Sequence, residues 1–155
     1  MTHIAIDPGK SGGIAWRDYD GNTHCQGMPE TERDFTDLIS EIRVRRWKGG
    51  CATTAFVEEV GGYVGGVGQP GSAMFKFGRN FGYVLGTFAA MDIPVALIKP
   101  QAWMRKLSLG TKDGRTTTAW KNHLKAAAQR RHPDLKITLK TADALLILAA
   151  GPHFI

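Results

Sequence analysis

Three places in the sequence join acidic residues to apolar segments in a way that can support chemistry. The acids are Asp7, the neighbouring pair Glu58 and Glu59, and Asp143. The first two places end an apolar run, whereas the third lies within one. A buried carboxylate is costly unless a cation or a hydrogen-bond donor compensates it. Taken alone, Asp7 is either a turn residue or a metal ligand.

Acids gathered at one site repel one another and require a hard cation, and oxygen ligands select Mg²⁺ or Mn²⁺. Two such ions activate a water molecule and stabilise the leaving oxygen in phosphodiester hydrolysis. Side chains alternate along a strand, so only one of Glu58 and Glu59 can share a site with Asp7. The acids therefore predict a nuclease that uses Mg²⁺, with two ions per site and Mn²⁺ as a substitute.

The charge of the chain indicates a polyanionic partner such as nucleic acid. Twenty lysine and arginine residues stand against 14 aspartate and glutamate residues, a formal net charge of +6. In the densest basic segment, Lys112, Arg115 and Lys121 are interpreted as contacts to the DNA backbone, with a solvated helix face as the alternative. Lys76 and Arg79 are further candidate DNA contacts near the start of a predicted helix.

The hydrophobic pattern predicts the elements that must position the acids. Predicted strands cover 3–6, 13–17, 23–28, 53–60 and 93–98, and predicted helices cover 30–47, 72–91, a short segment around Trp103, a segment after the basic loop that begins at Thr111, and 139–150. The length of 155 residues fits one domain spanning 1–155. The first and fourth strands can be neighbours in a mixed sheet, and the last helix can bring its acid to their ends.

Two glycine-rich stretches each have two interpretations. Gly61–Gly71 contains Tyr63 as its only aromatic residue and is either a flexible connector or a lip from which Tyr63 stacks on a base. Gly78, Gly82 and Gly86 recur every fourth residue of a predicted helix, although each weakens a helix by about 1 kcal/mol relative to alanine. This glycine stripe indicates close approach by another backbone, either the sheet beneath or the same helix of a second copy.

The ordered motifs resemble those of a known family. Ile-Ala-Ile-Asp-Pro-Gly at 4–9, Phe-Val-Glu-Glu-Val at 56–60, Met-Phe-Lys-Phe-Gly-Arg at 74–79 and Ala-Asp-Ala-Leu at 142–145 are similar to the RuvC Holliday-junction resolvases, in particular their bacteriophage and prophage branch, within the RNase H-like superfamily. The likeness extends over essentially the whole chain. It implies an RNase H-like α/β fold with a mixed five-stranded sheet flanked by helices.

The resemblance also implies a site, a substrate and a partner. It selects Glu58 over Glu59 and makes Asp7, Glu58 and Asp143 the catalytic, metal-holding acids. It implies a homodimer formed through the long central helix, whose two sites nick symmetric strands of a four-way (Holliday) or other branched DNA junction. The expected location is the cytoplasm of a bacterium or of a phage-infected host, without membrane association.

Two positions depart from the family pattern. Lys140 stands where the family usually has an acid or a histidine, three residues before the last aspartate. On one helix face with Asp143, Lys140 either acts catalytically, replacing the charge of one metal or positioning water and phosphate, or extends into solvent outside the site. The aromatic residue that enters the junction in the family is not matched in position, and Tyr63 replaces it by location only.

Other functions share some of these features. A non-catalytic branched-DNA-binding module and an RNase H-like nuclease acting on RNA or DNA are the nearest alternatives. An actin-like or sugar-kinase ATPase also has an Asp-x-Gly phosphate loop, but this chain lacks a second glycine-rich phosphate loop after a later aspartate. The two cysteines, Cys25 and Cys51, lack the spacing of a metal-binding pair.

Overall fold

A computed structural model describes residues 1–44, 52–59 and 71–155. The elements in chain order are β1 (Thr2–Asp7), β2 (Gly13–Arg17), β3 (Thr23–Gly27), α1 (Glu32–Val44), β4 (Thr53–Glu58), α2 (Gly71–Ala90), β5 (Val95–Ile98), α3 (Pro100–Lys106), α4 (Thr117–Arg131), α5 (Ala142–Ala150) and the 3₁₀ turn η1 (Gly151–His153). No helix among these described residues is long and apolar enough to cross a membrane.

The strands form one mixed sheet in the order β3-β2-β1-β4-β5. The first three strands pair antiparallel as a meander, and β1, β4 and β5 run parallel. A parallel pair places the carboxyl ends of both strands at the same edge. In the β1–β4 register Ile6 pairs with Val57, so the last residues of the two strands, Asp7 and Glu58, end at the same level.

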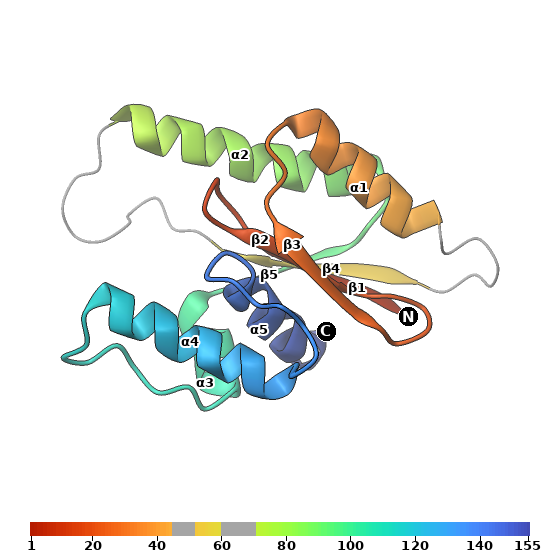
Figure 1. The fold of residues 1–155 in the computed structure, drawn as a ribbon. Coiled ribbons are helices and arrows are strands. Elements are labelled where there is room, and N and C mark those ends of the chain that lie inside the picture. Colours follow the sequence, from red (N-terminus) through yellow and green to blue (C-terminus); the bar gives the residue numbers. More distant parts are fainter. Residues whose placement is uncertain (45–51, 60–70) are drawn as a thin grey trace.

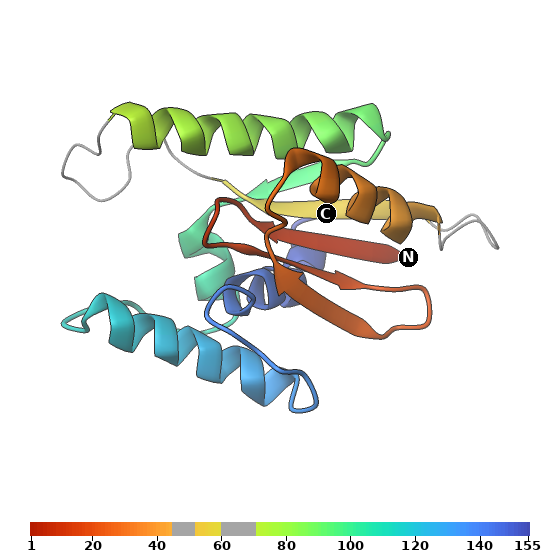
Figure 2. The same ribbon diagram turned by 45° about the horizontal axis from the view of Figure 1, so that its top comes forward.

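Helices cover both faces of this sheet, with α1 and α2 on one face and α3, α4 and α5 on the other (Figures 1 and 2). Each face has its own apolar core, as strand alternation requires. The core under α1 and α2 is formed by Ile4, Ile6, Ile14, Phe35, Ile39, Ile42, Ala55, Val57, Val84, Phe88 and Ile93. The opposite core includes Ala5, Ala15, Phe56, Trp103, Trp120, Leu124 and the apolar residues of α5. The predicted fold class is confirmed.

Element ends differ from the prediction where local hydrogen bonds compete with the apolar pattern. Helix α1 begins at Glu32 instead of residue 30, because the Thr31 hydroxyl accepts the Asp34 N–H at 3.1 Å and caps the first turn. Residues 45–47 of that predicted helix lie outside the described residues. Strand β5 begins at Val95 because the Ile93 N–H remains bonded to the Phe88 carbonyl of α2.

Helix α2 rests on the sheet through Val84, Thr87 and Phe88. Its glycine stripe points elsewhere: a Cβ added at Gly78, Gly82 or Gly86 meets no atom within 4 Å among the described residues. The interpretation that the sheet requires these glycines is therefore wrong. Within residues 1–44, 52–59 and 71–155, nothing packs against the stripe.

Candidate active site

The first two acids face the same side of the sheet. Asp7 shares its strand face with Ala5, and Glu58 shares its face with Phe56. Both apolar partners belong to the core under α5. Val57 belongs to the opposite core. Glu59 follows the alternation of Val57 and therefore points to that opposite face. Strand alternation thus brings Glu58, and not Glu59, to the same side as Asp7.

The turn that follows Asp7 is held by α2. The Gly9 N–H donates to Asn80 Oδ1 at 3.0 Å, and the ring of Phe77 lies against Gly9, whose φ of +108° favours glycine. Gly12 is required for a different reason, since a Cβ there would collide with the carbonyl oxygen of Asp7. The backbone around Asp7 is therefore fixed from two directions.

The third acid, Asp143, lies on α5, which packs on β1 and β2. A Cβ on Gly13 would collide with the Lys140 carbonyl oxygen, so this glycine allows the turn before α5 to approach β2 closely. The helix begins at Ala142, not Leu139, because the Thr138 N–H donates to Thr141 Oγ1 at 3.0 Å and forms a turn. Asp143 consequently lies in the first turn, where the helix dipole favours negative charge.

The electrostatics show that the three carboxyl groups share one environment. Burial, followed by repulsion from Glu58 and Asp143, raises the pKa of Asp7 to about 8. Burial also raises the pKa of Glu58 to about 7, against the opposing effect of a hydrogen bond from Trp103 and with a contribution from Asp143. The pKa of Asp143 is raised by burial as well. The fold thus brings together three acids whose negative charges it does not fully compensate.

Lys121 is the cation that acts on this group. Its charge lowers the pKa of both Asp7 and Asp143, against the larger effect of burial. The residue lies exposed in the second turn of α4, a helix that packs against α5. Sequence reasoning assigned Lys121 to the DNA backbone alone. In the structure its charge also acts on Asp7 and Asp143.

The donor chemistry fits a hard divalent cation, because the three acids offer only carboxylate oxygens and retain uncompensated charge. Within the described part of the chain, no group of three or more His, Cys, Asp or Glu side chains is arranged to hold an ion by itself. Mg²⁺ is commonly bound through one or two carboxylates, with water and substrate phosphates as its other ligands. A site of that kind matches the residues present.

Lys140 lies in the turn before α5, so the prediction that it shares a helix face with Asp143 is wrong. Its side chain is exposed and runs beside Gly27 at the end of β3, where Cδ lies 3.5 Å from the position a Cβ would take. The cation that lowers the pKa of Asp143 is Lys121.

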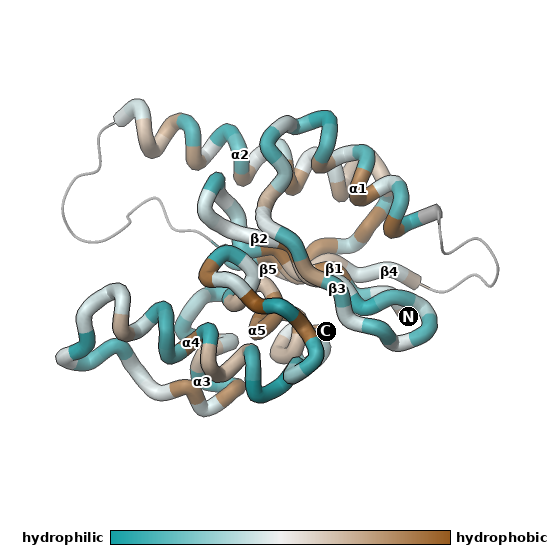
Figure 3. Tube along the Cα trace, in the orientation of Figure 1, coloured by the Kyte–Doolittle hydropathy of each residue, from teal (hydrophilic) through white to brown (hydrophobic). Residues whose placement is uncertain are grey.

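The remaining basic candidates occupy the surface around these elements. Lys112 donates to Thr117 Oγ1 at 2.9 Å, and the Arg115 guanidinium lies 5.5 Å from the centre of the Trp120 ring. Both belong to a hydrophilic stretch that leads into α4 (Figure 3).

On α2, Lys76 is exposed, and Arg79 forms an ion pair of 2.7 Å with Glu32 of α1. Arg79 is thus already partnered within the chain. Tyr63 lies outside the described residues.

Sequence reasoning missed two residues that hold the acids. Asn80 fixes the turn after Asp7, and Trp103 donates its indole N–H to Glu58 Oε2 at 2.8 Å. The one signal available for Trp103 was chemical: a buried indole carries a donor that needs an acceptor. Nothing in the spacing of Asn80 indicated its partner, 71 residues away.

Comparison with solved structures gives a likeness of fold. RuvC of Thermus thermophilus in complex with a Holliday junction substrate is 16% identical, with a TM-score of 0.59 over 97% of this chain and 92% of that chain. A second Thermus thermophilus RuvC structure is 18% identical, with a TM-score of 0.55 and the same coverage. No family model and no curated protein matches the sequence. The mixed sheet flanked by helices is therefore a RuvC-like, RNase H-like fold.

Proposed function

We propose that this protein is a metal-dependent endonuclease that cuts four-way DNA junctions by paired symmetric nicks. The observation that carries the proposal is that three partly buried acids, Asp7, Glu58 and Asp143, interact electrostatically with one another from β1, β4 and α5. The fold shared with a RuvC solved on a Holliday junction substrate supports a branched-DNA substrate.

In this proposal Asp7, Glu58 and Asp143 would each supply carboxylate oxygens, with water and the DNA phosphate as further ligands, to Mg²⁺ or Mn²⁺. The bound ion would supply an activated water and charge compensation for phosphodiester hydrolysis. Asp7 and Glu58 act from strand ends, which are rigid supports for a site. Asp143 completes the group from the first turn of α5. Lys121 attracts the scissile phosphate and offsets the repulsion that phosphate meets from the acids.

The basic surface beside the site binds the arms of the junction. Lys112 and Arg115 contact the phosphate backbone at the entrance to α4, and Lys76 does so from α2. Such contacts carry affinity and not sequence preference. The net charge of +6 supports this role.

Symmetric nicking requires two sites, and we assign their pairing to α2. The glycine stripe is exposed, is spaced for close helix approach and has no neighbour among the described residues. A second copy related by a two-fold axis would place its own α2 there. A homodimer with one site per protomer is the assembly this arrangement favours.

The test is cleavage of a labelled synthetic four-way junction, with linear duplex and flap DNA as controls, in Mg²⁺ and in Mn²⁺. Asp7→Asn removes one charge at constant shape, and Glu59→Gln is the matched control on the opposite strand face. Paired nicks that disappear in Asp7→Asn and persist in Glu59→Gln are expected. Tight junction binding without cleavage in either metal would instead identify a non-catalytic DNA-binding module.

A further inference from the structure

We propose that Trp103 is the positioning residue of the site: its indole fixes one oxygen of the Glu58 carboxylate and leaves the other oxygen for the cation. This inference rests on the proposed function, because it concerns the geometry with which Glu58 holds a metal. It assigns a role to a residue that touches neither substrate nor metal.

The hydrogen bond is short and well defined. Nε1 of Trp103 lies 2.8 Å from Oε2 of Glu58, within the range of a charge-assisted bond. An indole nitrogen is a donor only, so the contact cannot reverse when the carboxyl group changes protonation.

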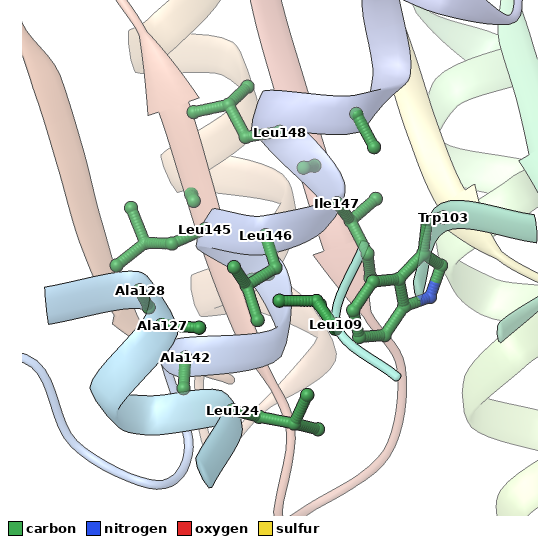
Figure 4. Close-up of a cluster of buried hydrophobic side chains, with 14 of the residues drawn as sticks. Trp103, Leu109, Leu124, Ala127, Ala128, Ala142, Leu145, Leu146, Ile147 and Leu148 are labelled. Carbon is green, nitrogen blue, oxygen red and sulfur yellow. The ribbon is translucent and has the colours of Figure 1, made fainter. Parts of the chain in front are cut away.

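The indole is itself immobile. Trp103 is 0% exposed and is among the largest fully buried side chains of the protein. Its ring lies beside Leu109 and Ile147 in the core formed with α5 (Figure 4). Pro100 begins α3 and fixes the backbone that carries the indole into this core. Trp103 cannot turn away from Glu58 without opening that packing.

The consequence is a preorganised ligand at a strand end. A glutamate side chain has three rotatable bonds, and fixing one carboxylate oxygen removes most of that freedom before a metal arrives. Because α3 and α5 hold the indole, the core that positions Glu58 is continuous with the helix that carries Asp143. Two metal-holding acids thus share one packed support.

The decisive variant is Trp103→Phe, which keeps an aromatic ring in the core, removes the donor and also reduces the volume of a fully buried side chain. We expect Mn²⁺ affinity, measured by calorimetry without DNA, to weaken by about 10- to 100-fold. Removing the hydrogen-bond partner of a metal ligand commonly lowers metal affinity by this factor. In the Glu58→Gln background the same substitution should have no further effect on Mn²⁺ affinity. A role in packing alone would lower thermal stability equally in both backgrounds and leave the affinity unchanged.

A second measurement does not depend on the folding of Trp103→Phe. The indole ¹⁵N–¹H resonance of Trp103 in the wild-type protein should shift when Mg²⁺ is added, because the carboxylate it contacts takes up the ion. A Trp103 resonance that is constant at saturating Mg²⁺, or wild-type affinity in Trp103→Phe, would overturn the inference alone. Absence of Mn²⁺ binding by the wild-type protein both without and with junction DNA would overturn the proposed function as well.

Discussion

Replacement of Asp7 by asparagine should stabilise the metal-free protein while abolishing the proposed nuclease activity. The folded-state pKa of Asp7 is about 8, against 3.8 for an ordinary aspartate, so the folded protein must keep this group protonated or bear its buried charge. The stability that depends on the protonated form is complete below about pH 4 and is lost as the pH rises toward 8. Asparagine is neutral throughout and avoids the loss.

The size of the effect follows from the pKa difference. One pH unit in this window corresponds to about 1.4 kcal/mol, so the cost in the wild-type protein is about 2 kcal/mol at pH 5 and about 4 kcal/mol at pH 7. Asp7→Asn should therefore exceed the wild type in free energy of unfolding by up to these amounts, and the difference should vanish as the pH falls below the ordinary aspartate pKa of 3.8. Chemical denaturation in EDTA across this pH range measures the difference directly.

Asp20→Asn, in the exposed turn between β2 and β3, is the matched control and should change stability by less than about 0.5 kcal/mol at every pH. Adding Mg²⁺ should stabilise the wild type more than Asp7→Asn, since only the wild type retains the full charge of the site. A difference between Asp7→Asn and the wild type that is independent of pH, or an asparagine variant less stable at pH 7, would refute the electrostatic account of this site.

Three further substitutions test neighbouring features. Lys121→Met should raise the pKa of Asp7 and Asp143 in the metal-free protein, because a positive charge that acts on them is lost. Carboxyl ¹³C titration measures these pKa values, and unaltered values would contradict the effect assigned to Lys121. Lys140→Ala should leave the metal dependence of cleavage unchanged, because the Lys140 side chain lies beside Gly27. A changed Mg²⁺ requirement would show that Lys140 takes part in the site. Gly82→Ala should add about 1 kcal/mol to monomer stability but weaken dimer formation in sedimentation experiments, and a dimer of unchanged affinity would exclude the glycine stripe as the interface.

The sequence was sufficient for the elements whose apolar pattern is unambiguous. The order of strands and helices follows from the hydrophobic periodicity. Strand alternation required that only one of Glu58 and Glu59 share a side of the sheet with Asp7, and the family resemblance, not the pattern, selected Glu58. The first residue of α5 was not predicted correctly. The turn from Thr138 to Thr141 is held by a side-chain hydrogen bond, which apolar periodicity does not encode. That error placed Lys140 on the wrong element.

The hydrophobic pattern also could not predict which residues far apart in the sequence interact in the fold. The charge of Lys121 acts on Asp7 and Asp143 because α4 packs on α5, and Trp103 hydrogen-bonds Glu58 across 45 residues of sequence. Such contacts depend on how helices cross over a sheet, which side-chain spacing within one segment cannot specify. The sequence identified the basic segment that contains Lys112, Arg115 and Lys121. Only the folded structure could show that one of these residues, Lys121, acts on the acids.

The distribution of the acids along the chain has a consequence for when activity can begin. Asp7 lies on the first strand and Asp143 on the last α-helix described, so 136 positions separate the two ends of the group. During synthesis, the strands that carry Asp7 and Glu58 emerge well before α5, and an incomplete chain offers only two of the three carboxylates. Under the proposed function, a chain without α5 lacks one of the three acids, and we expect it to begin cutting DNA only after α5 has packed on the sheet.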